Sequence, residues 1–323
     1  MPTVSVIIPV YNVERFVEAA IASVQAQTFQ DFELIIVDDG GQDRSIEICR
    51  RLADQRTRII EQKNRGLAGA RNTGIAAARG RYIALLDADD FWHAEKLARH
   101  VAHLESRPQV GVSYAGSILI DEAGHDMRIR QRPVLGMATA RQVFCGQTVK
   151  NGSVPVFRRA VFDEIAYRPV AGDREWYFDE TLRRSEDVEC WTRTALTSRY
   201  AFEGIRGDLT YYRINSSGLS ADIIRQLESW EEVCDKIAAF APDFIAAHEA
   251  EARARELRYL ARRAVQLRDT GLAVPLIVEA LKTWPMLALV SPLKTATTLA
   301  ASLLLRAVAD WTHTDARPSS AGK

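Results

Sequence analysis

The sequence predicts an α/β fold in which helices flank a mostly parallel sheet and a helical region follows. Three observations lead to this prediction. Short apolar runs rich in β-branched residues alternate with segments of helical spacing from Val4 to Leu104. Unusual polar clusters come directly after three of the apolar runs. From Asp222 onward only helical spacing remains. Such strand–helix alternation is typical of a parallel sheet that binds ligands at the carboxyl ends of its strands.

The alternating elements can be assigned in order along the chain. Expected strands are 4–10, 32–37, 58–61, 82–86, 110–120 and 152–157, and expected helices are 13–25, 45–53, 67–78 and 95–104. A further helix is expected to begin near Ser185, a candidate N-cap that acidic Glu186 and Asp187 follow. The polar clusters after the strands are Tyr11-Asn12, Asp38-Asp39 and 87–90. All three are therefore expected at one edge of the sheet.

The C-terminal part predicts helices at 222–240, 243–269 and 272–282 and a disordered tail at 312–323. Between them, an apolar stripe at helical spacing is formed by Leu293, Ala296, Ala300, Leu303, Leu304, Ala307 and Trp311. The segment 284–311 contains two prolines and Lys294, so it is a poor spanning helix. The stripe requires a cover: the protein's own helical domain, a partner subunit or a membrane surface. The arginine-rich stretch 253–268 fits a solvated helix face or an anionic lipid surface.

Composition excludes several classes of protein. The 323 residues suit one large domain or two moderate ones. The 42 basic and 42 acidic residues balance, so no net field would attract nucleic acid. Four scattered cysteines form no C-x-x-C pair and predict reduced thiols in a cytoplasmic protein. The N-terminus lacks the basic region of a signal peptide.

The stretch YIALLDADDFW places three carboxylates, Asp87, Asp89 and Asp90, directly after an apolar run. Crowded like charges raise one another's pKa unless a cation lies among them. A solvated turn is one interpretation, and a divalent cation at the strand end is the sharper one. His100 and His103 lie three residues apart without a third ligand, which favours a solvated helix face over a metal site.

Six segments in order resemble the inverting nucleotide-sugar transferases of glycosyltransferase family 2. They are VSVIIPVYN, FELIIVDDGGQD, NRGLAGARNTG, LLDADD, SEDVECWTR and YYRINSSGLS. The resemblance covers about residues 3–220 and rests on the ordered set, since any one segment alone is weak. It implies a GT-A-type domain at 1–220, with a nucleotide-binding half at about 1–120 and an acceptor half at about 121–220. The helical region at 221–311 lies outside it.

The resemblance also implies roles for individual residues. Nucleotide binding is assigned to Pro9, Tyr11, Asn12, Asp39, Asn64, Arg71 and Asp87, with Asp39 at the base and Asp87 at the ribose. Asp89 would be a ligand of Mg²⁺ or Mn²⁺, and Asp187 the general base, with Glu186 beside it. A surface ion pair is the alternative interpretation of Arg71.

Two residues depart from the family pattern. Gly41 stands where the family usually has serine, and Asn215 stands where the segment after Arg213 often continues to histidine. The Q-x-x-R-W signature of processive members is absent, and so are their transmembrane helices. Polymer extrusion is therefore not expected.

The sequence favours a metal-dependent, inverting glycosyltransferase that moves one sugar from a UDP-sugar to a glycan or lipid-linked acceptor in polysaccharide or glycoconjugate biosynthesis. The alternative is a catalytically inactive nucleotide-sugar-binding partner in an assembly. A sugar nucleotidyltransferase is disfavoured, because PVYNVERF stands where those enzymes carry a glycine-rich loop. We expect a cytoplasmic protein with peripheral contact to the inner face of the membrane through residues 284–311, and a homo-oligomer.

Overall fold

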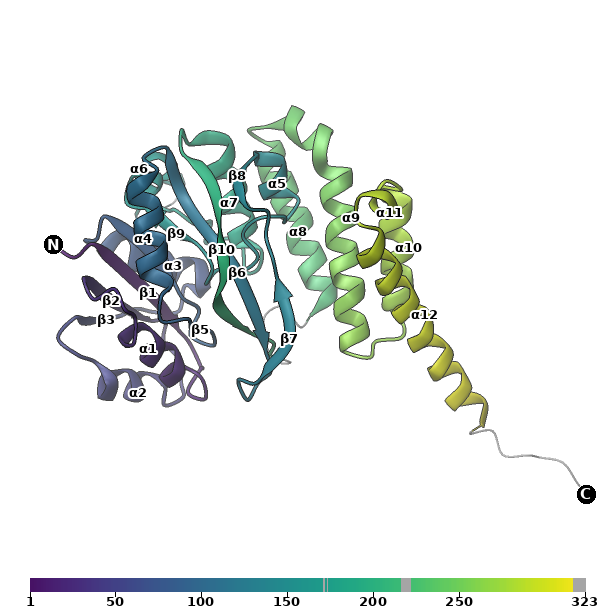
Figure 1. Ribbon diagram of the computed structural model, residues 1–323, viewed down its shortest axis with the longest axis horizontal. Coiled ribbons are helices and arrows are strands. Elements are labelled where there is room, and N and C mark those ends of the chain that lie inside the picture. The colour runs from purple at the N-terminus through teal and green to yellow at the C-terminus, as the bar shows by residue number, and fades with distance from the viewer. Residues whose placement is uncertain (171, 173, 216–221, 316–323) are drawn as a thin grey trace, which may run out of the picture. The chain divides into compact units, whose positions relative to one another are not determined.

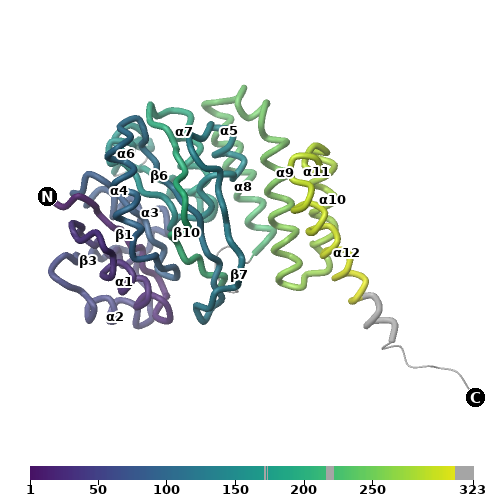
Figure 2. The backbone as a smooth tube through the Cα atoms, in the orientation of Figure 1, coloured from purple at the N-terminus to yellow at the C-terminus, as the bar shows by residue number. Residues whose placement is uncertain are grey.

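The structure is a computed structural model that describes residues 1–170, 172, 174–215 and 222–315, with side chains of the last helix through residue 309 (Figures 1 and 2). The chain divides into two compact units, Met1–Gly218 and Leu219–Lys323. The first is a mixed sheet between helices, and the second is helical. The predicted fold class is confirmed.

The described residues of the first unit form one sheet of ten strands. Its main order is β3 (Thr57–Glu61), β2 (Phe32–Asp38), β1 (Val4–Val10), β4 (Tyr82–Leu85), β9 (Val156–Arg158), β6 (Val110–Ile120), β10 (Ala201–Arg213) and β5 (Phe91–Trp92). Two more strands lie off this path: β7 (Asp126–Gln131) pairs with β6, and β8 (Gly136–Ala138) with β10. The run from β3 to β4 is parallel, as is β6 with β10, while β9, β5, β7 and β8 pair antiparallel.

The continuous apolar runs form the strands because both faces of the sheet are covered. All residues of β1 and β4 are buried. Register pairs Val10 with Asp38 and Ile7 with Leu85, so β1, β2 and β4 end at the same edge. The polar clusters that follow these strands therefore lie at one edge, as predicted.

Helices cover the sheet through two apolar clusters. One cluster contains residues of α1 (Val17–Gln25), α2 (Ser45–Leu52) and α4 (Lys96–Ser106). The other contains residues of α3 (Gly66–Ala77), α5 (Ala140–Phe144), α6 (Arg159–Ile165) and α7 (Glu186–Thr197). In β1, Val6 and Ile8 belong to the first cluster and Ile7 to the second, because successive side chains point to opposite faces of the sheet.

Several expectations about these elements were wrong. Residue spacing did not predict β5, β7, β8, β10, α5 or α6. The strand expected at 152–157 begins only at Val156. Helix α7 does begin after Ser185, but Ser185 has a left-handed φ of 56° and its side chain makes no capping hydrogen bond. His100 is fully buried rather than solvated, because its imidazole bonds to the buried Ser113 hydroxyl at 2.7 Å.

The second unit contains α8 (Ile223–Ala238), α9 (Pro242–Gln266), α10 (Ala273–Thr283), α11 (Leu287–Val290) and α12 (Pro292–Asp315). Helices α9, α10 and α12 pack against one another (Figure 2). Buried Leu257, Ala261 and Ile277 lie in one of the apolar clusters between them. Helix α12 continues beyond residue 311 to Asp315, into the predicted tail, and the remainder of that tail lies outside the described residues.

Helix α12 packs with the face opposite to the apolar stripe. Thr295, Thr298 and Ser302 are buried, whereas Leu293 and Leu304 are exposed. The hydroxyl of Thr295 donates to the Ser291 carbonyl and that of Thr298 to the Lys294 carbonyl, both at 2.8 Å. The two hydroxyl groups are therefore buried with their hydrogen bonds formed. Of the three covers left open for the apolar stripe, the helical domain is excluded for the described side chains of the stripe. The side chain of Trp311 lies outside the described ones. No helix within the described ranges is both long and apolar enough to cross a membrane.

Candidate active site

The turn after β1 is closed by backbone contacts with the loop after β2. Asn12 adopts a left-handed φ of 51°, and its Oδ1 accepts a hydrogen bond from the Gln42 N–H at 2.8 Å. A Cβ on Gly41 would lie 3.0 Å from the Asn12 nitrogen, so a larger residue there would press on this turn. Tyr11 is half exposed beside it. Pro9 lies within β1 rather than in the turn, and it is buried.

Asp39 anchors the start of α3. Its carboxylate accepts hydrogen bonds from the Gln62 amide at 2.6 Å, the Arg65 N–H at 2.8 Å and the Gly66 N–H at 2.9 Å. These bonds satisfy donors at the helix N-terminus and leave Asp39 buried. Asn64 is exposed next to them. The nucleotide-binding roles predicted for both residues stay predictions.

The acidic loop after β4 is fixed at its last carboxylate. Asp90 is buried and accepts hydrogen bonds from the Ser153 hydroxyl at 2.6 Å and the Arg213 N–H at 2.8 Å. Arg213 also donates its Nε–H to the Asp89 carbonyl at 2.7 Å. Burial, followed by repulsion from Asp87, raises the pKa of Asp89 to about 6.

Arg71 links the acidic loop to α7. Its guanidinium donates to Asp87 Oδ1 at 2.7 Å and to Glu186 Oε1 at 2.6 Å. Arg71 is only 1% exposed, so it is not a surface ion-pair residue. Burial alone would lower its pKa, but the carboxylates of Asp87 and Glu186 outweigh burial and raise it. A predicted nucleotide contact thus connects residues of the two predicted halves.

Asp187 follows Glu186 in the first turn of α7. It is half-buried, and burial, followed by repulsion from Glu186, raises its pKa to about 7. The turn into α7 passes through the left-handed Ser185, a conformation that is uncommon outside glycine and concentrates at functional sites. A carboxyl group that titrates near neutrality is suited to accept a proton.

Sequence reasoning missed Gly152, Ser153 and Arg213. A Cβ on Gly152 would lie 2.2 Å from Arg71 Nη2 and 2.9 Å from Asp87 Oδ2, so only glycine lets the backbone pass this ion pair. Ser153 accepts a hydrogen bond from the Asp87 N–H at 3.0 Å. The Asn-Gly-Ser triplet at 151–153 was the signal available, and it was interpreted as the start of a strand.

Asp87 and Asp89 fit a divalent cation. Hard cations take oxygen ligands, and Mg²⁺ is commonly held by one or two carboxylates together with water and substrate phosphates. Within the described ranges no cluster of three or more His, Cys, Asp or Glu side chains could hold an ion without such help. The raised pKa of Asp89 shows that negative charge is costly there, and a cation would relieve that cost.

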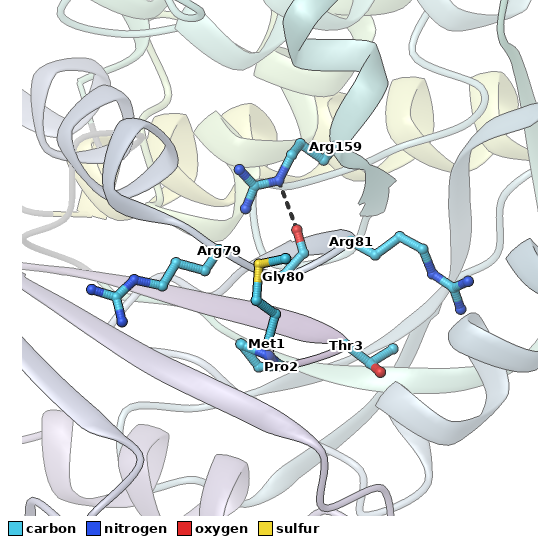
Figure 3. A pocket seen from close by; sticks show the side chains of 7 residues that line it. All are labelled: Met1, Pro2, Thr3, Arg79, Gly80, Arg81 and Arg159. Atoms are coloured by element: carbon cyan, nitrogen blue, oxygen red, sulfur yellow. Dashed lines mark hydrogen bonds between the residues drawn. The ribbon is translucent and has the colours of Figure 1, made fainter.

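A hollow of about 500 Å³ lies away from these residues (Figure 3). It is lined by residues that precede β1 and β4, including Thr3 and Arg81, and so it lies at the amino ends of the parallel strands. Arg159 donates its Nε–H to the Gly80 carbonyl there at 2.7 Å. The guanidinium groups of Arg79 and Arg81 point in different directions (Figure 3). They do not converge on one ligand position.

Comparison with protein families decides the class of the chain. The model of glycosyl transferase family 2 matches residues 5–166, half of the chain. The chain belongs to glycosyl transferase family 2. Proteins of similar sequence include the uncharacterized glycosyltransferase alr2836 of Nostoc sp., 33% identical over 66% of this chain and 65% of that protein. The uncharacterized glycosyltransferase EpsJ of Bacillus subtilis is 54% identical over 28% of this chain and 27% of its own length. The matched part of the chain thus spans less than two thirds of the length of these relatives.

Solved structures show the same fold at low sequence identity. Mannosyltransferase PcManGT from Pyrobaculum calidifontis, in complex with GDP-Man and Mn²⁺, superposes with a TM-score of 0.60 and 22% identity over 95% of this chain and 86% of that one. TarS 1-349 of S. aureus, in complex with UDP-GlcNAc, gives 0.57 and 16% identity over 98% and 92%. The predicted GT-A-type fold of this family 2 chain is confirmed.

Proposed function

We propose that this protein is a metal-dependent, inverting glycosyltransferase that moves one sugar from a UDP-sugar to a hydroxyl group of a glycan or lipid-linked acceptor. The observation that carries the proposal is the Arg71 bridge between Asp87 and Glu186. The bridge connects the acidic loop to the first turn of α7, where the base candidate Asp187 directly follows Glu186. Biosynthesis of a polysaccharide or glycoconjugate is the process such a transfer serves.

Asp187 has the chemistry of the general base in this proposal. The acceptor oxygen attacks the anomeric carbon, its proton passes to the Asp187 carboxylate, and the bond from the anomeric carbon to the diphosphate oxygen breaks. A single displacement of this kind inverts configuration at the anomeric carbon. The diphosphate leaves with its electron pair, and a bound Mg²⁺ or Mn²⁺ would neutralise that charge.

The other residues bind and orient. Asp89, with Asp87 beside it, would hold the metal, and Asp87 would also face the ribose. The end of β1 at Pro9 and the turn at Tyr11 and Asn12 would receive the base, together with Asp39 and Asn64. Glu186 positions Asp187 through Arg71, because its own carboxylate is engaged with that guanidinium.

Donor and metal are proposed partly by analogy. Among proteins of the same fold, TarS binds UDP-GlcNAc, and PcManGT binds GDP-Man with Mn²⁺. Both show that a GT-A-type fold accommodates a nucleotide sugar. A soluble reaction on the cytoplasmic side, with peripheral contact to the inner face of the membrane through residues 284–311, and a homo-oligomeric state complete the proposal.

The experiment is a panel of UDP- and GDP-sugars, scored for release of nucleoside diphosphate with Mg²⁺, Mn²⁺ or chelator. We expect release with one donor, lost on chelation. Asp89→Ala should lose metal-supported donor binding. Asp187→Asn should keep donor and metal affinity but lose about 10²- to 10⁴-fold in turnover, because only the proton acceptor is removed.

Two outcomes would contradict this proposal. Normal turnover of Asp89→Ala in the presence of chelator would show that the reaction needs no metal ion. Tight donor binding by the wild-type protein with no release for any donor and acceptor would support the alternative function, an inactive nucleotide-sugar-binding partner.

A further inference from the structure

The outward face of α12 is apolar and exposed. Leu293, Leu304 and Val308 lie on one side of the helix and are 75%, 66% and 51% exposed. In α11, Leu289 is 71% exposed. The inward face is occupied by Thr295, Thr298 and Ser302, so the helix has already used its other side for packing. A cluster of exposed leucines on one helix face is typical of an interaction site.

Cationic side chains gather at the start of this face. Lys294 directly follows Leu293, and burial together with the charges of Arg258, Arg262 and Arg255 lowers its pKa. Burial, together with the charges of Arg255 and Arg262, lowers the pKa of Arg258 to about 10. Arg258 also donates to the Thr295 hydroxyl at 3.2 Å, which fixes the cluster against α12. Arg255 is paired with Glu251 at 2.9 Å, so the uncompensated positive charge of this group comes from Lys294, Arg258 and Arg262, and it attracts an anion.

The segment between Met286 and Ala309 contains no aspartate or glutamate, while Lys294 and Arg306 supply positive charge. Apolar side chains beside an arginine and lysine cluster are the pattern of a helix that lies in the plane of a membrane interface. No helix among the described residues could span a bilayer, which agrees with a helix lying on it.

We propose that the α12 face, defined by Leu293, Leu304 and Val308, together with the basic cluster of Arg258, Arg262 and Lys294, binds a bilayer of anionic lipids. The leucines enter the boundary between headgroups and acyl chains, and the basic cluster contacts lipid phosphates. This inference names the lipid chemistry and the residues for the membrane contact in the proposed function. It does not depend on which sugar is transferred.

Charge favours a membrane over a second copy of the chain. A symmetric dimer through this face would bring together only the side chains of this face, because an isologous interface uses the same patch on both copies. The face offers no carboxylate between Met286 and Ala309 to compensate. Anionic headgroups supply the missing negative charge and tolerate the apolar side chains in the same surface.

The test is flotation of the full-length protein with vesicles of phosphatidylcholine alone or with phosphatidylglycerol. We expect binding only to the mixed vesicles, weakened by salt. Leu293→Glu and Leu304→Glu should each reduce binding at least tenfold, and Arg262→Ala about fivefold, since each cation near the surface contributes about that factor. The matched control is Leu267→Glu, because Leu267 is an exposed leucine at the end of α9, outside the face.

Each remaining outcome has a defined meaning. Equal binding of wild type and Leu304→Glu, or no binding to mixed vesicles, overturns the proposal. Concentration-dependent dimerisation in light scattering that Leu304→Glu abolishes assigns the face to a second copy and also overturns it. Release of nucleoside diphosphate in solution is measured for every variant and should be unchanged. If the wild-type protein does not float but releases nucleoside diphosphate, only the membrane contact is rejected. If the wild-type protein releases no nucleoside diphosphate, the proposed transferase activity is rejected.

Discussion

Arg71 places a positive charge inside the protein between two carboxylates of different elements. Asp87 comes from the loop after β4, and Glu186 comes from the first turn of α7. Both pairs are direct hydrogen-bonded contacts; Arg71 and Glu186 are buried, whereas Asp87 is partly exposed. A buried charge of this kind is stable only while its partners remain, and its field also lowers the pKa of the neighbouring Asp187 against the effects of burial and Glu186.

Replacing Arg71 by methionine should leave the buried Glu186 and the partly buried Asp87 without their cationic partner. We expect the free energy of unfolding to fall by about 3–5 kcal/mol, measured by urea denaturation. Adding Glu186→Gln to Arg71→Met should recover part of this loss, because it removes one of the unpaired charges. If the double variant is as unstable as the sum of the two single variants, the pair is not coupled.

The pH dependence of turnover should reveal Asp187. Its pKa is raised to about 7, so the carboxylate proposed to accept the proton is present above that pH and is lost as pH falls through it. We expect log kcat to fall with a slope of one below about pH 7. The residual activity of Asp187→Asn should show no such limb. A wild-type profile that is flat between pH 5.5 and 8 would assign the base elsewhere.

At the scale of elements, the strands that sequence reasoning found and those it missed differ in their environment. β1, β2 and β4 are buried on both faces and appear as continuous apolar runs. β10 contains glycines and charges and pairs with β6 through register shifts, so no regular period marks it. Apolar spacing alone did not indicate which face of α12 packs inward, because threonines can pack inward when their hydroxyls bond to their own backbone.

The same contrast applies to the site. The acidic loop and the start of α7 could be predicted, because carboxylates beside strand and helix ends have a recognisable spacing. Their connection through Arg71 could not, since it joins residues separated by 115 positions. Gly152 was equally hidden, because its importance lies in the absence of a side chain next to Arg71.

Gly152→Ala should break the connection between elements without touching a reacting group. The added methyl would lie 2.2 Å from Arg71 Nη2, so the loop or the guanidinium must move. We expect reduced kcat with a lower melting temperature. Gly271→Ala is the control, because its Cβ would meet only the Asp269 carboxylate, at 3.3 Å. Wild-type kcat in Gly152→Ala would show that the Arg71 bridge tolerates displacement.

At the scale of the whole molecule, each unit has its own apolar clusters. Those of the first unit lie about the sheet, and those of the second lie among α8, α9, α10 and α12. The acidic loop, Arg71 and α7 all belong to Met1–Gly218. Ligand binding should therefore stabilise that unit directly.

Hydrogen exchange should show where the ligand acts. A nucleoside diphosphate with Mn²⁺ at 100 times its Kd stabilises the state that binds it by about 2.7 kcal/mol. We expect slower exchange in β1, β4 and α7 and no change in α9 and α10. Equal protection of both units would show that they open as a single cooperative body.

The bond between Asp90 and the Arg213 N–H also has a consequence for synthesis. The two residues are 123 positions apart, and a ribosome adds about 5–20 residues each second. Roughly 6–25 seconds pass between translation of the acidic loop and arrival of the residue that anchors it. During that interval the nascent chain carries the carboxylates of the site without their support. The proposed competence to bind a nucleotide sugar would thus be acquired only late in translation, after β10 has left the ribosome and joined the sheet.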